Sequence, residues 1–474
     1  MRLVVRWALS NRLIAVFDLG CMKASPLIHL ILCGLGVFAN RSGGADTETD
    51  TTVFVITPAA LETLFGSVRT NNTSLRAAEA RFQQARTTIA TVRDWEDPTV
   101  SLGGVVAGPR RGGLTQEGDL IYGVEQKLPL WDRPRLSRAI AVAESATQGA
   151  AVAQREQGLR AELTKALLRV ALVGRNLHYL TNDLVWLDTH LLLQEARSRA
   201  LAGSPSELLM LQNERSKRTD SILSERNRLR TEEASLNRLL NWALSLTWPP
   251  MRLPQLMPSY TNSTPLAAYA VTHEARAKVL RQEIAQARAV IRLTETDRLP
   301  TVSVGMGARQ FSGDGGLREG MLSVNFNLPW LNAPKYRADI ARATAKLRVV
   351  EADLADYELG LREEVLRLTL AAEATGRSAV LYRDEISQRL EQALALQLIK
   401  WETRQGQLRD VLDTRRTALE AQLMVERATA EQHLALADLA ALCGLPDHFQ
   451  LDRLLRSLGG PAQPQQEAVG PGNP

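Results

Sequence analysis

Pro98-Thr99-Val100-Ser101-Leu102-Gly103 recurs 202 residues later as Pro300-Thr301-Val302-Ser303-Val304-Gly305. Three further pairs follow in the same order, at offsets between 200 and 203 residues. They are Leu128-Pro129 with Leu328-Pro329, Glu207-Leu208-Leu209 with Asp410-Val411-Leu412, and Leu236 and Leu239 with Leu439 and Leu442. Matching pairs in one order at a nearly constant offset indicate that a single structural unit occurs twice in the chain.

Both copies have the same expected plan: a helix, two short strands, a very long helix and a return helix. The first repeat is expected over 46–246, with a helix over 58–93, a β-hairpin over 99–128 and a helical hairpin over 134–242. The second is expected over 265–456, with a helix over 265–298, a β-hairpin over 301–328 and a helical hairpin over 334–442. Four prolines, with Pro265 at the edge, predict an extended connector over 247–264, and the composition of 457–474 predicts a disordered tail.

The helical hairpin of the first repeat has a seven-residue apolar period. Its long helix carries Leu163, Val170, Leu177, Leu184 and Leu191, and its return helix carries Leu208, Ile222, Leu229 and Leu236, with Arg215 at the missing position. This period predicts left-handed coiled coils. A helix of about 67 residues would be about 100 Å long, which suits a structure that crosses a gap.

The expected strands alternate between apolar and small or polar residues. Val302, Val304 and Met306 oppose Ser303, Gly305 and Gly307, and the other strands follow the same rule. Glycine-rich polar turns are expected over 109–118 and 312–320. Strand lengths of about 9–11 residues and an apolar face are typical of membrane β-strands. Trp95, Trp131 and Trp330 fall at one end of the strands, as expected for a membrane interface.

Two hairpins alone would leave two open sheet edges, which cannot face lipid. Three chains that contribute four strands each would form a closed barrel of twelve strands. The fold class predicted is therefore mainly α with membrane β, assembled as a trimer. The alternative is a pair of ordinary amphipathic hairpins on a soluble core.

The first 45 residues have the form of a secretory signal. Five bases and one acid give them a net charge of +4, and an apolar run over 26–39 ends in Val37-Phe38-Ala39. Ala45 is a second candidate cleavage position, Met22 a second candidate start, and a membrane anchor the alternative. Without this leader the net charge of +5 falls to 5 − 4 = +1, which gives no electrostatic case for nucleic acid.

Taken in order, three stretches resemble the outer-membrane efflux protein family, the TolC-like channels. They are Asn71-Asn72-Thr73-Ser74-Leu75-Arg76-Ala77-Ala78, Gln126-Lys127-Leu128-Pro129-Leu130-Trp131 and Asn327-Leu328-Pro329-Trp330-Leu331-Asn332. The resemblance implies a homotrimer whose twelve-stranded outer-membrane barrel continues as a helical tunnel across the periplasm. It further implies a periplasmic adaptor and an inner-membrane pump as partners, and a passive exit duct as the function.

The resemblance also implies roles at the helix tips. Asp410 and Asp413 match the Asp-x-x-Asp pair that lines the closed entrance of such channels, where rings of carboxylates would favour cations. An exposed acidic turn at a helix N-terminus is the alternative. Adaptor docking is expected at Gly203, Ser204, Glu207, Arg404 and Gly406. The family usually has glycine where this chain has Arg404, and the corresponding position of the first repeat is Leu201.

Ser204-Pro205-Ser206-Glu207 resembles the tip of the heavy-metal efflux branch, the CzcC-like channels, so heavy-metal cations or small toxic compounds are the expected cargo. No two histidines show ligand spacing, and no catalytic motif occurs, so neither an enzyme nor a cofactor is expected. The alternatives are the outer component of a type I protein secretion system, a periplasmic adaptor and a soluble coiled-coil scaffold.

Overall fold

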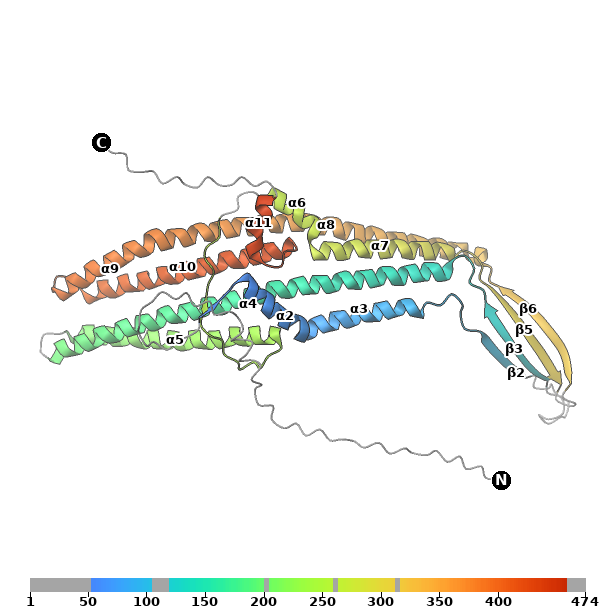
Figure 1. The fold of residues 1–474 in the computed structure, drawn as a ribbon, viewed down its shortest axis with the longest axis horizontal. Helices are drawn as coiled ribbons and strands as arrows, with labels where there is room; N and C mark the ends of the chain where they lie inside the picture. The colour runs from blue at the N-terminus through green and yellow to red at the C-terminus, as the bar shows by residue number, and fades with distance from the viewer. Residues whose placement is uncertain (1–52, 105–118, 200–203, 259–262, 312–315, 458–474) are drawn as a thin grey trace, which may run out of the picture. The chain divides into compact units, whose positions relative to one another are not determined.

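The computed structural model describes residues 53–104, 119–199, 204–258, 263–311 and 316–457. Both repeats have the same order of main elements (Figure 1). In the first repeat these are α2 (Pro58–Asn71), α3 (Thr73–Thr91), β2 (Thr99–Gly104), β3 (Asp119–Lys127), α4 (Arg133–Arg199) and α5 (Pro205–Leu240). In the second they are α6 (Thr264–His273), α7 (Ala275–Thr296), β5 (Val302–Phe311), β6 (Leu317–Phe326), α8 (Ala333–Leu381), α9 (Ser387–Glu402) and α10 (Leu408–Leu442).

The first helix of each repeat, expected to be continuous, is broken in two. Asn72 and Glu274 occupy the breaks with extended backbone, at ψ 123° and 137°. The Asn72 side chain accepts hydrogen bonds from the backbone of Ser74 and Leu75, and the Glu274 side chain accepts one from Ala277. Each break is therefore the N-cap of a new helix, α3 or α7, at equivalent positions of the two repeats.

The long helices match the sequence pattern in length, with one irregularity. α4 has 67 residues and rises about 100 Å. The single helix expected over 334–403 is instead divided into α8 and α9 by a π-helical turn, η2 (Tyr382–Ile386). Of the seam residues, Leu163, Val170, Ile222 and Leu236 are buried. The seven-residue period thus marks the faces along which α4 and α5 pack.

The four strands form one antiparallel sheet in the order β2-β3-β5-β6. The central pairing, β3 with β5, joins the two repeats, and places Gly123 opposite Gly307. β6 begins at Leu317, and Gly320 pairs with Ala308, so the turn expected over 312–320 is shorter than the sequence suggested. Residues 312–315 and the turn at 109–118 lie outside the described residues. Figure 1 shows the sheet at one end of the helices.

The proline-rich connector is more ordered than an extended linker. β4 (Met251–Arg252) pairs in parallel with β1 (Phe54–Val55), at the start of the described chain. Farther along, the side chain of Gln432 on α10 exchanges two hydrogen bonds with the backbone of Met257. The connector is thus fastened to both repeats. The short elements η1 (Pro329–Asn332), η3 (His448–Gln450) and α11 (Leu451–Ser457) complete the structure, and 458–474 lies outside the described residues.

Buried apolar residues form separate clusters along the helices. One lies where α6, α8, α10 and α11 meet, around Leu266, Val365 and Leu436. Another lies near the ends of α4, α5, α9 and α10, around Leu211, Trp401 and Val411. Among the described residues, no helix combines the length and apolarity needed to span a bilayer.

We expect Asn72→Ala to destabilise the protein by about 1–2 kcal/mol, because α3 loses its cap and the carbonyl of Leu239 loses the donor 2.9 Å away. Thermal unfolding followed by circular dichroism in detergent measures the change. Asn227→Ala, an exposed position on α5, is the matched control. Equal unfolding midpoints for the two variants would contradict the capping role.

Candidate functional site

One face of the sheet exposes an apolar surface. Leu102 is 77% exposed, Met306 68%, Leu322 78% and Phe326 59%. Val100, Val124 and Val324 lie on the same face. Monomeric soluble proteins rarely leave such a contiguous surface uncovered, so this face requires an apolar environment.

The opposite face of the sheet consists of small and polar residues. A side-chain carbon added at Gly123 would lie 3.1 Å from Ser101 Oγ, and one at Gly305 would lie 2.7 Å from Ser323 Oγ. A larger residue at either position would crowd the serine of the neighbouring strand, so glycine fits this face best. The alternation predicted from sequence has a physical counterpart in two chemically different faces.

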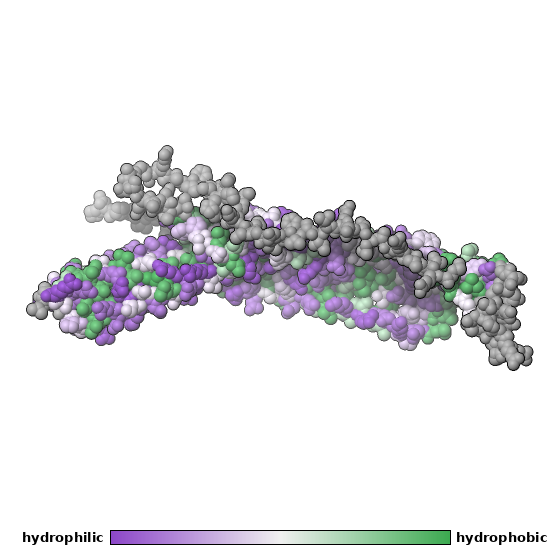
Figure 2. Space-filling model, turned by 90° about the horizontal axis from the view of Figure 1, so that it is seen from below, coloured by the Kyte–Doolittle hydropathy of each residue, from purple (hydrophilic) through white to green (hydrophobic). Residues whose placement is uncertain are grey.

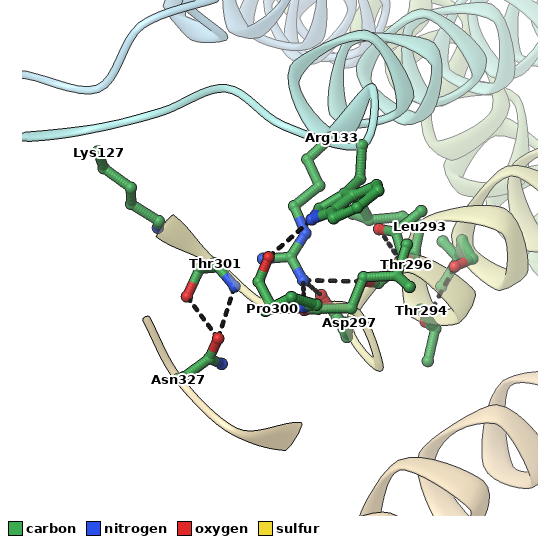
Figure 3. Close-up of polar contacts among 12 residues, drawn as sticks. Lys127, Arg133, Leu293, Thr294, Thr296, Asp297, Pro300, Thr301 and Asn327 are labelled. Atoms are coloured by element: carbon green, nitrogen blue, oxygen red, sulfur yellow. Dashed lines mark hydrogen bonds and ion pairs between the residues drawn. The ribbon is translucent and has the colours of Figure 1, made fainter. Parts of the chain in front are cut away.

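Polar contacts between the repeats fix the junction between strands and helices (Figure 3). Arg133, at the start of α4, donates hydrogen bonds to the carbonyls of Thr296 and Leu299, at 2.8 and 3.0 Å. Trp131 Nε1 donates to the carbonyl of Pro300 at 2.7 Å. Within the second repeat, Thr301 donates to the Asn327 side chain from its backbone and its hydroxyl, which ties the start of β5 to the end of β6. The turn after β3 is thereby tied to the turn before β5.

The three tryptophans expected at a membrane interface lie at this junction. Trp95 precedes β2, Trp131 follows β3, and Trp330 lies in η1 after β6. They are 54%, 46% and 58% exposed. Trp131 has a left-handed backbone, with φ 63°, which the bond to Pro300 helps to hold.

The backbone of the second-repeat tip explains why the glycine stands at position 406, two residues after Arg404. Arg404 ends α9 in the left-handed region, at φ 63°, a conformation that favours glycine. Gly406 is needed for another reason: a side-chain carbon there would lie 3.0 Å from Lys400 Cβ and 3.3 Å from the Lys400 carbonyl carbon. The backbone N–H groups of Gln405 and Gly406 both donate to the Lys400 carbonyl, which closes the helix end.

The first-repeat tip is organised by Gln194. Its side chain, 1% exposed, donates to Glu207 Oε2 at 2.9 Å and to the Ser204 carbonyl at 3.4 Å. Ser204 precedes α5 and makes no side-chain capping bond to the helix. Gly203 and Leu201 lie outside the described residues. The two polar residues expected at this tip are thus brought together by a third, which the sequence analysis did not single out.

The two aspartates of the second tip differ in their surroundings. Both are exposed, one turn apart at the start of α10. Asp413 forms ion pairs with Arg416, at 3.0 Å, and with Arg409, at 3.8 Å. Asp410 has no ion-pair partner within the described part of the chain. The charge of Asp413 is therefore compensated locally, whereas that of Asp410 is not.

A buried ionic network joins the two helical hairpins just behind the tips. Asp183 on α4, 1% exposed, accepts hydrogen bonds from Arg218 on α5 and Arg415 on α10, each at 2.7 Å. The Arg415 guanidinium also lies over the ring of Trp186, 5.0 Å from its centre. A buried carboxylate is stable only with such partners, so Asp183 holds three helices in one arrangement.

Glu214 on α5 makes a second link in this network. Its carboxylate accepts hydrogen bonds from Arg416 on α10 and Lys217 on its own helix. Burial alone would raise the pKa of Glu214, but these two cations outweigh burial and leave its pKa below the ordinary value. The carboxyl is therefore ionised at neutral pH and ties α5 to α10.

This network was not predicted from the sequence. A signal was present, since Asp183 falls beside the seam residue Leu184, within the apolar stretch that contains Leu180 and Leu187. A lone acid in such a stretch predicts a buried partner.

Within the described residues no group of three or more His, Cys, Asp or Glu side chains could hold a metal ion. Figure 2 shows hydrophilic and hydrophobic residues interspersed over the helices on the face it presents.

Comparison with known proteins agrees with this architecture. Residues 64–241 match the model of the family described as outer membrane efflux protein. The chain is similar to the outer-membrane channel OprN (TM-score 0.70, 18% identity, covering 81% of this chain and 90% of that one). It is also similar to VceC from Vibrio cholerae (TM-score 0.67, 16% identity, covering 82% of this chain and 97% of that one). The CmeC outer membrane channel of Campylobacter jejuni is similar as well (TM-score 0.67, 12% identity, covering 90% of this chain and 97% of that one). No curated protein matches the chain at a significant level.

The match to the family model confirms the resemblance to outer-membrane efflux proteins that the sequence indicated. The structural likeness also confirms the mainly helical fold. At these identities the structural likeness concerns the fold.

We expect Asp183→Asn to destabilise the protein by about 3–5 kcal/mol, because Arg218 and Arg415 would remain largely buried without a carboxylate. The measurement is the thermal unfolding midpoint in detergent. The matched control is Asp188→Asn, whose partner Arg215 is half exposed and whose loss should cost about 0–1 kcal/mol. A drop no larger for Asp183→Asn than for its control would show that the buried network does not hold the hairpins.

The Glu214 link should weaken in acid. Folding lowers the pKa of Glu214, so its contribution to stability is complete above the ordinary pKa of about 4.3. That contribution is lost as the pH falls through the lower pKa of the folded state. The distribution of distances between spin labels on the exposed ends of α5 and α10 should broaden when the pH is lowered from neutral to about pH 3. Glu214→Gln should be broad at both pH values. A variant indistinguishable from the wild type at neutral pH would contradict the link.

Proposed function

We propose that this chain is one protomer of a trimeric outer-membrane channel, which acts as the passive exit duct of a tripartite efflux system. The observation that carries this proposal is the four-stranded sheet, which has one exposed apolar face and, among the described residues, two unpaired edges, β2 and β6. In lipid every backbone polar group needs a partner, so an open sheet must close on itself or on other copies. The family match supports the same conclusion.

Closure by three copies satisfies this requirement. β6 of one protomer would pair with β2 of the next, giving twelve strands with the apolar face toward lipid and the small polar face toward the lumen. Trp95, Trp131 and Trp330 would then lie at the periplasmic interface of the bilayer. The localisation proposed is the outer membrane of a Gram-negative cell, reached by means of the leader.

The helices would extend this duct into the periplasm. α4 and the segment formed by α8, η2 and α9 give each protomer two helical rods long enough to cross much of that space, about 100 Å each. The duct supplies no energy and is not an enzyme. Transport would be driven by an inner-membrane pump, joined through a periplasmic adaptor that docks on the helix tips at Gly203, Ser204, Glu207, Arg404 and Gly406.

We further propose that Asp410 and Asp413 line the periplasmic entrance, with unequal roles. Between Lys400 and Arg416 the second tip carries five bases and three acids, a net charge of 5 − 3 = +2. Because Asp413 is paired with two of these arginines, the uncompensated carboxylate of Asp410 would provide most of the attraction for cations. The cargo proposed is small toxic compounds, heavy-metal cations among them.

The proposed function is tested by purifying the protein in mild detergent and recording from planar bilayers. A trimer in light scattering, together with stepwise conductance, is the expected result. A monomer, or a trimer that never conducts, would overturn the proposal. A protein extracted without detergent would instead favour a soluble coiled-coil scaffold.

At the entrance we expect Asp410→Asn to reduce cation preference more than Asp413→Asn does, because only the first removes an uncompensated charge. Reversal potentials in a salt gradient measure the preference. Replacing both residues with alanine should also raise conductance, because the carboxylate side chains no longer narrow the entrance and the ion pairs of Asp413 with Arg409 and Arg416 are lost. If all variants had the same cation preference as the wild type, Asp410 and Asp413 would not line the entrance.

A further inference from the structure

We propose that Glu125 on β3 is a second determinant of cation preference, inside the barrel and far from the helix tips. This inference rests on the proposed function, since it concerns what the lumen of the channel favours. Glu125 lies opposite Thr99 on β2 and Gly305 on β5, on the small and polar face of the sheet. The neighbouring Val124 points to the exposed apolar face.

The Glu125 carboxylate is held in place by neutral donors. Ser303 Oγ on β5 donates to Glu125 Oε1, and Asn325 Nδ2 on β6 donates to the same oxygen at 3.3 Å. Gly305, opposite Glu125 on β5, adds no side chain to this face, and a side-chain carbon there would lie only 2.7 Å from Ser323 Oγ. The carboxylate is therefore held against the neighbouring strands at the wall of the barrel and does not extend freely into the lumen.

Neutral donors fix a carboxylate without cancelling its charge. The nearest base on the same face, Lys127, is engaged by Glu96 Oε1 at 2.7 Å. Farther along the sheet, Arg309 lies in register with Glu319 on the neighbouring strand. This distinguishes Glu125 from Asp413, which two arginines compensate.

Three copies of Glu125 would form one ring, because equivalent residues of a symmetric trimer lie at the same height. Water-filled pores select between ions through such rings of fixed charge. The glycine and serine neighbours keep the wall thin at this level, so the carboxylates border the lumen directly. Cations would thus be favoured where the helical tunnel meets the barrel as well as at the tunnel entrance.

The test is the reversal potential of single trimers in planar bilayers under a potassium chloride gradient. Glu125→Gln, which keeps the shape and loses the charge, should lower the ratio of cation to anion permeability by about twofold or more. Ser303→Ala is the matched control: it removes one hydrogen bond of Glu125 and keeps the charge, so its ratio should stay close to the wild type. A Glu125→Gln channel with the wild-type ratio would overturn the inference while leaving the channel itself established.

A second variant keeps the inference testable if Glu125→Gln does not assemble. Glu125→Cys can be modified in the open channel with a methanethiosulfonate that carries a sulfonate or a trimethylammonium group. The negative reagent should restore cation preference, and the positive one should reduce it further. Wild type treated with the same reagents is the control and should not change, since Cys443 is 1% exposed and burial raises the pKa of its thiol to about 12. Identical preference after both reagents would overturn the inference, whereas a wild-type protein that never conducts would overturn the proposed function instead.

Discussion

The unpaired edges of the four-stranded sheet are the constraint on which the rest of the structure depends. β2 and β6 each present a row of backbone donors and acceptors, and the adjoining apolar face is exposed. A lone monomer suits neither medium, because in lipid the edges lack hydrogen-bond partners and in water the apolar face is exposed. The proposed trimer meets both demands at once, and it also determines which face of the sheet borders the lumen.

The duplication supplies the framework, but its halves carry different chemistry. Both repeats break their first helix at equivalent capping residues, Asn72 and Glu274, and both end the return helix with a left-handed residue, Asn241 or Gly444. The charged groups are not equivalent in this way. Asp183 belongs to the first repeat and Arg415 to the second, so the ionic network exists only because the repeats lie against each other.

Much of the fold could be read from the sequence because periodicity reports on packing directly. The heptads predicted the long helices, and the alternation predicted two faces of one sheet. Where the reading failed, the cause was a local competition that periodicity does not register. A side-chain cap at Asn72 interrupts an otherwise regular helix, and a π turn at 382–386 accommodates one extra residue within α8 and α9. The unequal surroundings of Asp410 and Asp413 likewise depend on where arginine side chains reach.

The sequence by itself determined the repeat, the order of the elements and the two chemical faces of the strands, because each follows from spacing along the chain. Only the tertiary structure decided which charges meet. Asp183 and Arg415 are separated by 232 residues, and Glu125 and Asn325 by 200, yet each pair is within hydrogen-bonding distance. No local pattern encodes such pairings, since they arise from the antiparallel register of β3 with β5 and from the packing of α4 against α10.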